Sequence, residues 1–167
     1  MNLKQSLIEN NSIKLHQTAK NWEEAIKLGT DMLIASGAVE PRYHDTIIKC
    51  VKELGPYIII APHLAMPHAR PEDGVNRTAF ALITLDTPIY FDGEDEPVDV
   101  LLTLAGSDAN QHIQGLMEIT QVLDDPDSDT GINLDKIRRC QTAEDVYAVI
   151  DAVLKLNKKG IIMSKPL

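Results

Sequence analysis

Two apolar runs near the middle of the chain, Ala79-Phe-Ala-Leu-Ile-Thr-Leu85 and Val98-Asp-Val-Leu-Leu-Thr-Leu104, decide the fold. Each is a short, nearly continuous apolar stretch that includes β-branched residues, which is typical of a buried strand rather than a surface helix. A third run, Tyr57-Ile-Ile-Ile-Ala61, has the same character. We therefore expect three largely buried strands in the centre of the protein.

Helical periodicity precedes these strands. One helix is predicted to begin after Asn21, which forms a capping box with Glu24, and to end near Gly37. A second helix is predicted from Pro41, since proline suits the first helical position, to the break at Gly55-Pro56.

Two further helices are predicted after the strands. The first follows the capping candidates Ser107, Asp108 and Asn110 and has an apolar face consisting of Ile113, Leu116, Met117, Thr120 and Leu123. The second begins at Thr142, with Asp145 three residues later, and ends near Asn157. Helices on both sides of central strands predict a layered α/β or α+β domain.

Length and charge narrow the possible functions. The chain has 167 residues and a net charge of −9, so we expect one domain over residues 1–157 and no nucleic-acid ligand. Residues 158–167 are expected to form a flexible C-terminal extension. The apolar runs are too short for membrane insertion. Cys50 and Cys140 form no C-x-x-C pair, and the N-terminus lacks the pattern of a signal peptide, so we expect a cytoplasmic protein.

The densest group of chemically capable residues is Ala61-Pro-His-Leu-Ala-Met-Pro-His-Ala-Arg-Pro71. Pro67 restricts its own φ angle and favours an extended Met66, so His68 leaves the preceding strand in a defined direction. A neutral imidazole has one nitrogen with a free lone pair, so His68 can act as a nucleophile. We expect His68 in a shallow depression whose apolar rim includes Leu64 and Met66.

A second group, Gly106-Ser-Asp-Ala-Asn-Gln-His112, also follows a predicted strand and opens a helix. If the two strands are neighbours with their carboxyl ends on one rim, His68 and His112 face a shared cleft. The N-terminal end of the second helix favours an anion there. Such a site suits a phosphoryl group, because phosphoryl transfer needs mainly positioning and charge stabilisation.

With these motifs, the sequence resembles the enzyme IIA components of the bacterial phosphoenolpyruvate-dependent sugar phosphotransferase system (PTS), of the mannitol/fructose type. The resemblance spans residues 3–156 and includes Leu64-Ala-Met-Pro-His68, whose histidine is the phosphorylated residue of the family, and His112, which matches the second family histidine. Glu40-Pro-Arg-Tyr43, Gly55-Pro-Tyr57 and Pro97-Val-Asp99 are similar to the ascorbate-specific branch. The resemblance implies a three-layer α/β/α sandwich with a mixed sheet of about five strands.

The resemblance also implies partners. His68 would accept a phosphoryl group from the phosphorylated histidine carrier protein and pass it to a cysteine of a IIB component. This step would feed a membrane IIC transporter for ascorbate or a similar sugar acid. No cofactor or metal is implied, and a homodimer is compatible with the resemblance.

The sequence departs from the family at two places. Ala69 stands where relatives have glycine after the active histidine, which disfavours a left-handed backbone there. The preceding helix offers Lys49 and Lys52 where many relatives have an arginine, and neither lysine is assigned a role. Arg70 is either an electrostatic neighbour of the phosphoryl group or a solvated surface residue.

Two other functions remain open from the sequence. A regulatory IIA-like protein would use the same phosphorylation to control a partner; the lack of an attached regulatory domain in this chain favours transport. Alternatively, His63, His68 and His112 could bind zinc together with Asp108, because imidazole is a common zinc ligand.

Overall fold

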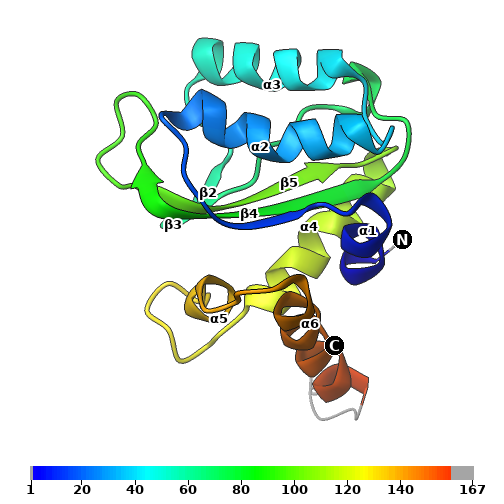
Figure 1. Ribbon diagram of the computed structural model, residues 1–167, viewed down its shortest axis with the longest axis vertical. Coiled ribbons are helices and arrows are strands. Elements are labelled where there is room, and N and C mark those ends of the chain that lie inside the picture. The colour runs from blue at the N-terminus through cyan, green and yellow to red at the C-terminus, as the bar shows by residue number, and fades with distance from the viewer. Residues whose placement is uncertain (1, 159–167) are drawn as a thin grey trace.

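The protein is built around one five-stranded mixed sheet, and the computed structural model describes residues 2–158 (Figure 1). The elements in chain order are α1 (Leu3–Asn10), β1 (Ile13–Gln17), α2 (Trp22–Ala35), α3 (Pro41–Leu54), β2 (Ile59–Ala61), β3 (His63–Ala65), a 3-10 turn (Pro71–Asp73), β4 (Ala79–Ile89), β5 (Val98–Ala105), α4 (Ala109–Leu123), α5 (Asp135–Arg138) and α6 (Ala143–Lys158).

The strands lie in the order β1-β4-β5-β3-β2. β1 pairs with β4 in parallel, β4 pairs with β5 antiparallel, and β3 pairs with β5 in parallel. The sheet ends in the short antiparallel pair of β2 and β3. Because β3 and β5 are parallel neighbours, the segments that follow them leave from the same edge of the sheet.

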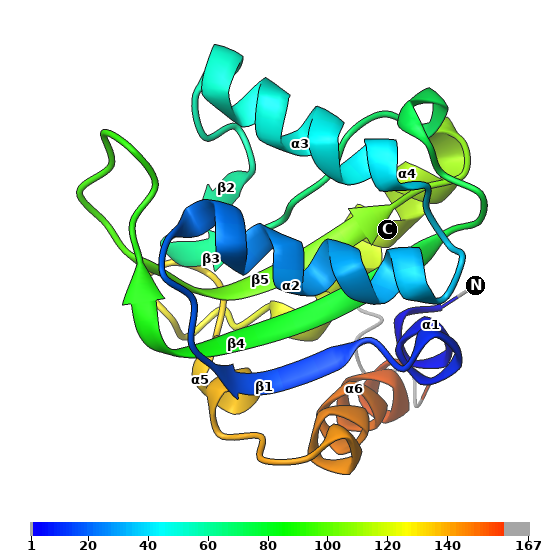
Figure 2. The ribbon, with the colours of Figure 1, turned by 45° about the horizontal axis from the view of Figure 1, so that its top comes forward.

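Helices cover both faces of the sheet. Figures 1 and 2 show α2 and α3 on one face, and α1, α4, α5 and α6 on the other. Each face buries its own apolar cluster: Trp22, Ile26, Leu33 and Tyr43 are members of the first, and Leu7, Ile119, Val146 and Ile150 are members of the second. The three-layer α/β/α sandwich with a mixed sheet is confirmed.

The local signals before the strands are largely confirmed. α2 begins after Asn21, whose side chain accepts the Glu24 N–H. The expected capping box is only half formed, since the Glu24 carboxylate accepts from the N–H of Lys20 instead of Asn21. α3 begins at Pro41 and is capped by Gly55 in a positive-φ conformation.

Two expectations about burial are wrong. The predicted strand 57–61 is reduced to β2, and its residue Ile60 is 47% exposed because β2 lies at the edge of the sheet with one pairing neighbour. The predicted apolar face of α4 is wrong at Ile113 and Met117, which are exposed, while Leu123 is buried and Leu116 packs against the core as predicted. α4 instead buries a narrower stripe of Gly115, Ile119, Val122 and Leu123 against the sheet.

The end of the chain agrees with the capping pattern. The hydroxyl of Thr142 accepts the Asp145 N–H, and the Asp145 carboxylate accepts the Thr142 N–H, which completes the capping box of α6. The predicted flexible extension, 158–167, lies outside the described residues apart from Lys158, the last residue of α6. Among residues 2–158, none of the helices is long and apolar enough to cross a membrane.

Candidate functional site

The structure brings His68 and His112 together. His68 lies three residues beyond β3, and His112 lies in the first turn of α4, which follows β5. Since β3 and β5 are parallel neighbours, both histidines lie at the same edge of the sheet. Their ring centroids are 5.2 Å apart with an interplanar angle of 60°. The two rings therefore form one site.

The ring of His68 is oriented by its own backbone neighbour. Its Nδ1 lies 2.6 Å from the carbonyl oxygen of Met66. A carbonyl oxygen only accepts hydrogen bonds, so Nδ1 carries the proton and Nε2 keeps its lone pair. The edge of the ring meets Tyr57, with centroids 5.3 Å apart, and the Tyr57 hydroxyl donates to the His68 carbonyl. Both contacts restrict the histidine before any partner binds.

His112 is positioned by the cap of α4. The Asp108 side chain accepts the N–H of Gln111, and the Asp108 carbonyl accepts the N–H of His112. Among the described residues, the buried Nδ1 of His112 has no hydrogen-bond partner. A buried N–H without an acceptor is costly, so the proton of the neutral ring belongs on Nε2. His112 is therefore a hydrogen-bond donor through Nε2.

The charge state of His112 follows from its surroundings. Burial lowers the pKa of His112, because it penalises the charged imidazolium, and the nearby ring of His68 lowers it further. At neutral pH the neutral form is therefore favoured. A neutral donor next to the free Nε2 of His68 can bind an anionic group that arrives between the rings.

Gly106 allows the close approach of the loop before α4. A Cβ atom at this position would lie 2.6 Å from the Cα and 2.7 Å from the Cβ of His112. Nonbonded carbon atoms do not approach this closely, so any larger side chain at position 106 would displace His112. The sequence places this glycine between the end of β5 and the cap of α4, but its contact with His112 requires the structure.

The two rings open into a cleft of about 630 Å³. Its lining combines apolar and polar side chains: Thr46, Cys50, Leu54, Tyr57, His68, Ala69, Arg70, Pro71, Asp73, Ala109, His112 and Ile113. The exposed apolar residues at its edge are Leu54, at 74%, and Ile113, at 54%. Tyr57, 36% exposed, lies with them.

The expectation that Leu64 and Met66 form the apolar rim of the cleft is wrong. Both are 1% exposed and belong to the apolar cluster that contains Leu7 and Ile119. Leu64 lies in β3, inside the sheet, and Met66 follows directly after that strand. Cys50 is partly buried and lines the cleft.

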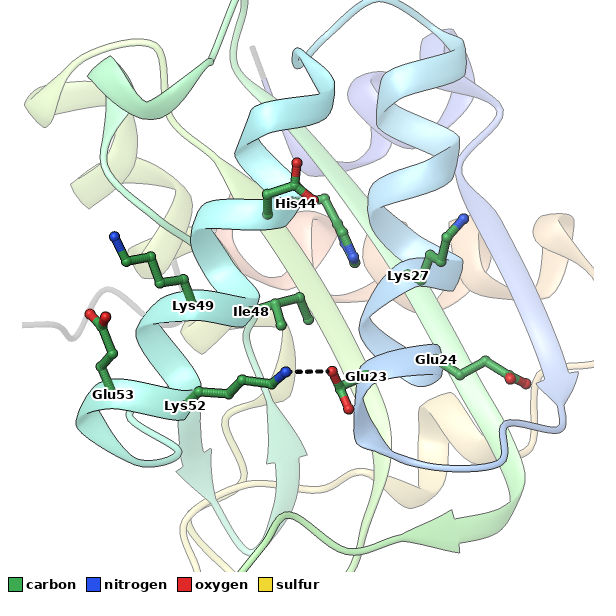
Figure 3. A pocket seen from close by; sticks show the side chains of 9 residues that line it. Glu23, Glu24, Lys27, His44, Ile48, Lys49, Lys52 and Glu53 are labelled. Atoms are coloured by element: carbon green, nitrogen blue, oxygen red, sulfur yellow. Dashed lines mark ion pairs between the residues drawn. The ribbon is translucent and has the colours of Figure 1, made fainter.

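The residues around the histidine motif have mixed outcomes. Ala69 is accommodated without a positive φ, so the alanine in place of glycine causes no left-handed strain. Arg70 lines the cleft, but its guanidinium also pairs with Asp73, with Nε and Oδ2 3.4 Å apart. Lys49 and Lys52 line a separate groove between α2 and α3 (Figure 3).

His63 is not part of the site. It begins β3, pairs with Val98 at the other end of the strand, and its Nδ1 lies 3.0 Å from the Pro97 carbonyl oxygen. Within residues 2–158, no group of three or more His, Cys, Asp or Glu side chains is arranged to hold a metal ion. The arrangement of three histidines and Asp108 considered for zinc is therefore not formed in the described chain.

Comparisons with known proteins identify the family of the chain. Residues 6–153 match the family model described as "Phosphoenolpyruvate-dependent sugar phosphotransferase system, EIIA 2". The chain is 48% identical over 153 residues to the ascorbate-specific PTS system EIIA component of Salmonella choleraesuis, covering 90% of this chain and 96% of that protein.

Solved structures give the same result. A crystal structure of a PTS IIA protein from Streptococcus mutans has a TM-score of 0.84 and 41% identity, with coverage of 93% of this chain and 96% of that chain. The solution structure of the mannitol-specific cryptic phosphotransferase enzyme IIA CmtB from Escherichia coli has a TM-score of 0.78 and 30% identity, covering 91% and 99%.

The fold and the paired histidines define a phosphoryl-transfer protein with a mannitol-type IIA architecture. The chain belongs to the EIIA 2 family of the phosphoenolpyruvate-dependent sugar phosphotransferase system. It is a phosphotransferase component of that system.

Proposed function

We propose that the protein is a cytoplasmic phosphocarrier that accepts a phosphoryl group on Nε2 of His68. The observation that carries this proposal is the contact between His68 Nδ1 and the Met66 carbonyl oxygen, which leaves Nε2 as the nitrogen with the nucleophilic lone pair. The donor is the phosphorylated histidine carrier protein. The acceptor is a cysteine of a IIB component, which serves a membrane IIC transporter.

Each of the two transfer steps forms one bond to phosphorus and breaks another. The lone pair of His68 Nε2 attacks phosphorus, a new N–P bond forms, and the N–P bond to the donor histidine breaks. In the second step the thiolate sulfur of the IIB cysteine attacks the same phosphorus, and the bond to His68 breaks. Because the reaction needs little covalent chemistry from the protein, positioning and charge stabilisation provide most of the catalysis.

His112 stabilises the transferred group in this proposal. Its Nε2–H donates to a phosphoryl oxygen, while the buried Nδ1 stays unprotonated. The low dielectric around a partly buried ring strengthens such a hydrogen bond. The ring separation of 5.2 Å leaves His112 close enough to serve the group that is bound to His68.

The mouth of the cleft fits an exchange with two protein partners. Leu54, Tyr57 and Ile113 provide an exposed apolar edge near the histidines, and such an edge can be covered when a partner docks. The 48% identity to an ascorbate-specific EIIA component supports ascorbate, or a similar sugar acid, as the transported compound.

Phosphoryl labelling tests the proposal. The purified chain is incubated with labelled phosphoenolpyruvate, the histidine carrier protein and the enzyme that phosphorylates this carrier. The incorporated label is measured by mass spectrometry. The unaltered protein is expected to gain a label that is stable in alkali and lost in acid, as phosphohistidine is. His68→Ala is expected to lose the label completely, because it removes the accepting nitrogen.

His44→Ala is the matched control, since His44 is also partly buried but lines the separate groove between α2 and α3. It is expected to be labelled like the unaltered protein. Full labelling of His68→Ala would disprove the assignment of His68. Chase of the label to a purified IIB component then tests the second step.

A further inference from the structure

The parallel pairing of β3 with β5 can be continued to His68. Leu64 pairs with Val100 and Ala65 with Leu101, so the same register places His68 opposite Leu104. In a parallel ladder, a residue such as Leu104 bonds to the two neighbours of the residue opposite it. Its N–H donates to the carbonyl of the preceding neighbour, and its carbonyl accepts the N–H of the following neighbour. Leu104 should therefore bond to the Pro67 carbonyl and to the Ala69 N–H.

Only the first of these two bonds is direct. The Leu104 N–H donates to the Pro67 carbonyl oxygen at 3.0 Å. At the second position the hydroxyl of Tyr43 lies between the two strands. It accepts the Ala69 N–H at 3.0 Å and donates to the Leu104 carbonyl oxygen at 2.7 Å. A side chain of α3 has replaced one bond of the ladder.

The inserted hydroxyl of Tyr43 separates the two backbone segments next to His68, the residue that accepts the phosphoryl group in the proposed function. A direct bond would hold the Ala69 nitrogen and the Leu104 oxygen about 3 Å apart. With an oxygen inserted between them, the backbone after His68 is held away from β5. Tyr43 can do this because its ring is fully buried in the core and comes from α3, which packs over the same edge of the sheet.

The hydroxyl is well suited to this role. A buried phenol needs hydrogen-bond partners, and both groups of the interrupted ladder are satisfied by it. Burial also raises the pKa of Tyr43, so the hydroxyl keeps its proton and remains a donor to Leu104. No backbone group is left unpaired by the opening of the ladder at this position.

We propose that Tyr43 is a positioning residue for phosphoryl transfer, whose hydroxyl holds the β3–β5 ladder open at His68 and so fixes the imidazole beside His112. The proposal rests on the proposed function of His68. Closure of the ladder would move the backbone of His68 and Ala69 toward β5. A displacement of about 1 Å at a reacting group can cost about a hundredfold in rate.

Tyr43→Phe removes the hydroxyl and keeps the ring in the core. The first measurement is the scalar coupling across the hydrogen bond between the Ala69 nitrogen and the Leu104 carbonyl carbon, recorded by NMR on isotope-labelled protein. The unaltered chain is expected to show no such coupling, because the hydroxyl separates the two groups. The variant is expected to show it, because the direct ladder bond can then form.

The second measurement is the rate of phosphorylation by the phosphorylated carrier. Tyr43→Phe is expected to lower the rate at saturating carrier about tenfold to a hundredfold, with the half-saturating carrier concentration changed by less than about twofold. Tyr147→Phe is the matched control, since this partly buried tyrosine of α6 packs against the cluster on the other face of the sheet. It is expected to transfer normally.

The third measurement is the ring ¹⁵N chemical shifts of His68, which are expected to change in Tyr43→Phe. General destabilisation of the fold does not change these shifts. A direct Ala69–Leu104 coupling in the unaltered protein would overturn the proposal even if Tyr43→Phe failed to fold. A folded Tyr43→Phe with unchanged His68 ring signals and an unchanged transfer rate would also overturn it. If the unaltered chain accepts no phosphoryl group, the proposed function fails separately, and the coupling and ring signals still test the opening of the ladder.

Discussion

Two hollows of similar size flank α3, and each contains a partly buried histidine. The cleft at the edge of the sheet has a volume of about 630 Å³ and contains His68 and His112. The groove between α2 and α3 has a volume of about 550 Å³ and contains His44 (Figure 3). Size alone therefore does not distinguish the reactive site from the other hollow.

In the groove, the histidine and several charged side chains already have partners. His44 Nδ1 lies 2.6 Å from the hydroxyl oxygen of Thr30, which lies on the facing helix. Figure 3 shows Lys52 reaching toward Glu23 across the groove, with an N–O distance of 3.2 Å. Exposed ion pairs of this kind add little stability, but they leave few free groups for a ligand.

The cleft differs in its unused hydrogen-bonding capacity. His68 keeps the lone pair of Nε2, and among the described residues His112 has no partner for its buried Nδ1. Burial lowers the pKa of both His44 and His112, but only His112 has a second imidazole beside it that lowers its pKa further. A lowered pKa thus fails to separate the two hollows, whereas paired rings with free nitrogens do.

The largest difference between substitutions in the cleft and in the groove is expected in the rate of phosphoryl transfer, when the ring of His112 is removed. His112→Ala is expected to keep the fold and to slow phosphoryl transfer about 10-fold to 1,000-fold, as for loss of one charge-stabilising donor. The rate is measured by rapid-quench labelling with phosphorylated carrier, and the fold by circular dichroism. The same substitution at His44 is the control, and it should leave the rate unchanged. Equal rates for His112→Ala and the unaltered protein would remove His112 from the mechanism.

The sequence predicts where His112 lies because the physics behind its position is local. Strand 98–104 and the cap at Asp108 are determined by β-branched residues and by an N-cap side chain, so the position of His112 in the first turn could be read directly. Pro67 restricts the backbone before His68, but the strand that leads to it is β3, which was not predicted. The predicted strand 57–61 became β2, which pairs with β3 and is not a neighbour of β5. The two histidines converge because β3, instead of that strand, pairs with β5 in parallel.

The other features depend on tertiary contacts. α1 and β1 were not predicted, because their apolar residues are few and β1 is stabilised by pairing with β4. The face of α4 was misassigned at Ile113 and Met117, which share a helical period with the buried residues but lie toward solvent. Tyr43 and Gly106 act through partners about 60 and 6 residues away, and no sequence spacing encodes these contacts.

A smaller effect is expected where the support of His112, rather than its ring, is changed. A methyl group at position 106 would lie 2.6 Å from the Cα of His112, so Gly106→Ala must shift the first turn of α4. We expect transfer to slow about tenfold while His68 remains able to accept the label. The measurement is the single-turnover labelling rate.

Gly29→Ala is the matched control for this substitution. Its added methyl would lie 2.5 Å from the Thr103 hydroxyl oxygen, in the packing of α2 against β5 and away from both rings of the site. It is expected to lower the unfolding midpoint without a selective loss of transfer. If both glycine variants slow transfer equally at matched stability, Gly106 has no specific role in positioning His112.

The smallest effect is expected in the groove, where it concerns stability and not transfer. Burial lowers the folded-state pKa of His44 below its usual 6.5, and this outweighs the opposing influence of Asp45 and Asp31. Folding therefore favours the neutral ring, so the unfolded chain binds more protons at mildly acidic pH. The contribution of His44 is fully present above pH 6.5 and is lost as the pH falls through the folded-state pKa.

His44→Gln keeps a hydrogen-bonding group for the Thr30 hydroxyl but does not titrate. At pH 8 its free energy of unfolding should lie within about 1 kcal/mol of the unaltered protein, since one hydrogen bond is conserved in kind. Below pH 6.5 the unaltered protein should lose stability relative to the variant, as measured by urea unfolding at a series of pH values. A relative gain on acidification would mean that His44 is held as the charged form. The groove would then resemble an ion-binding site more closely than the paired surface described above.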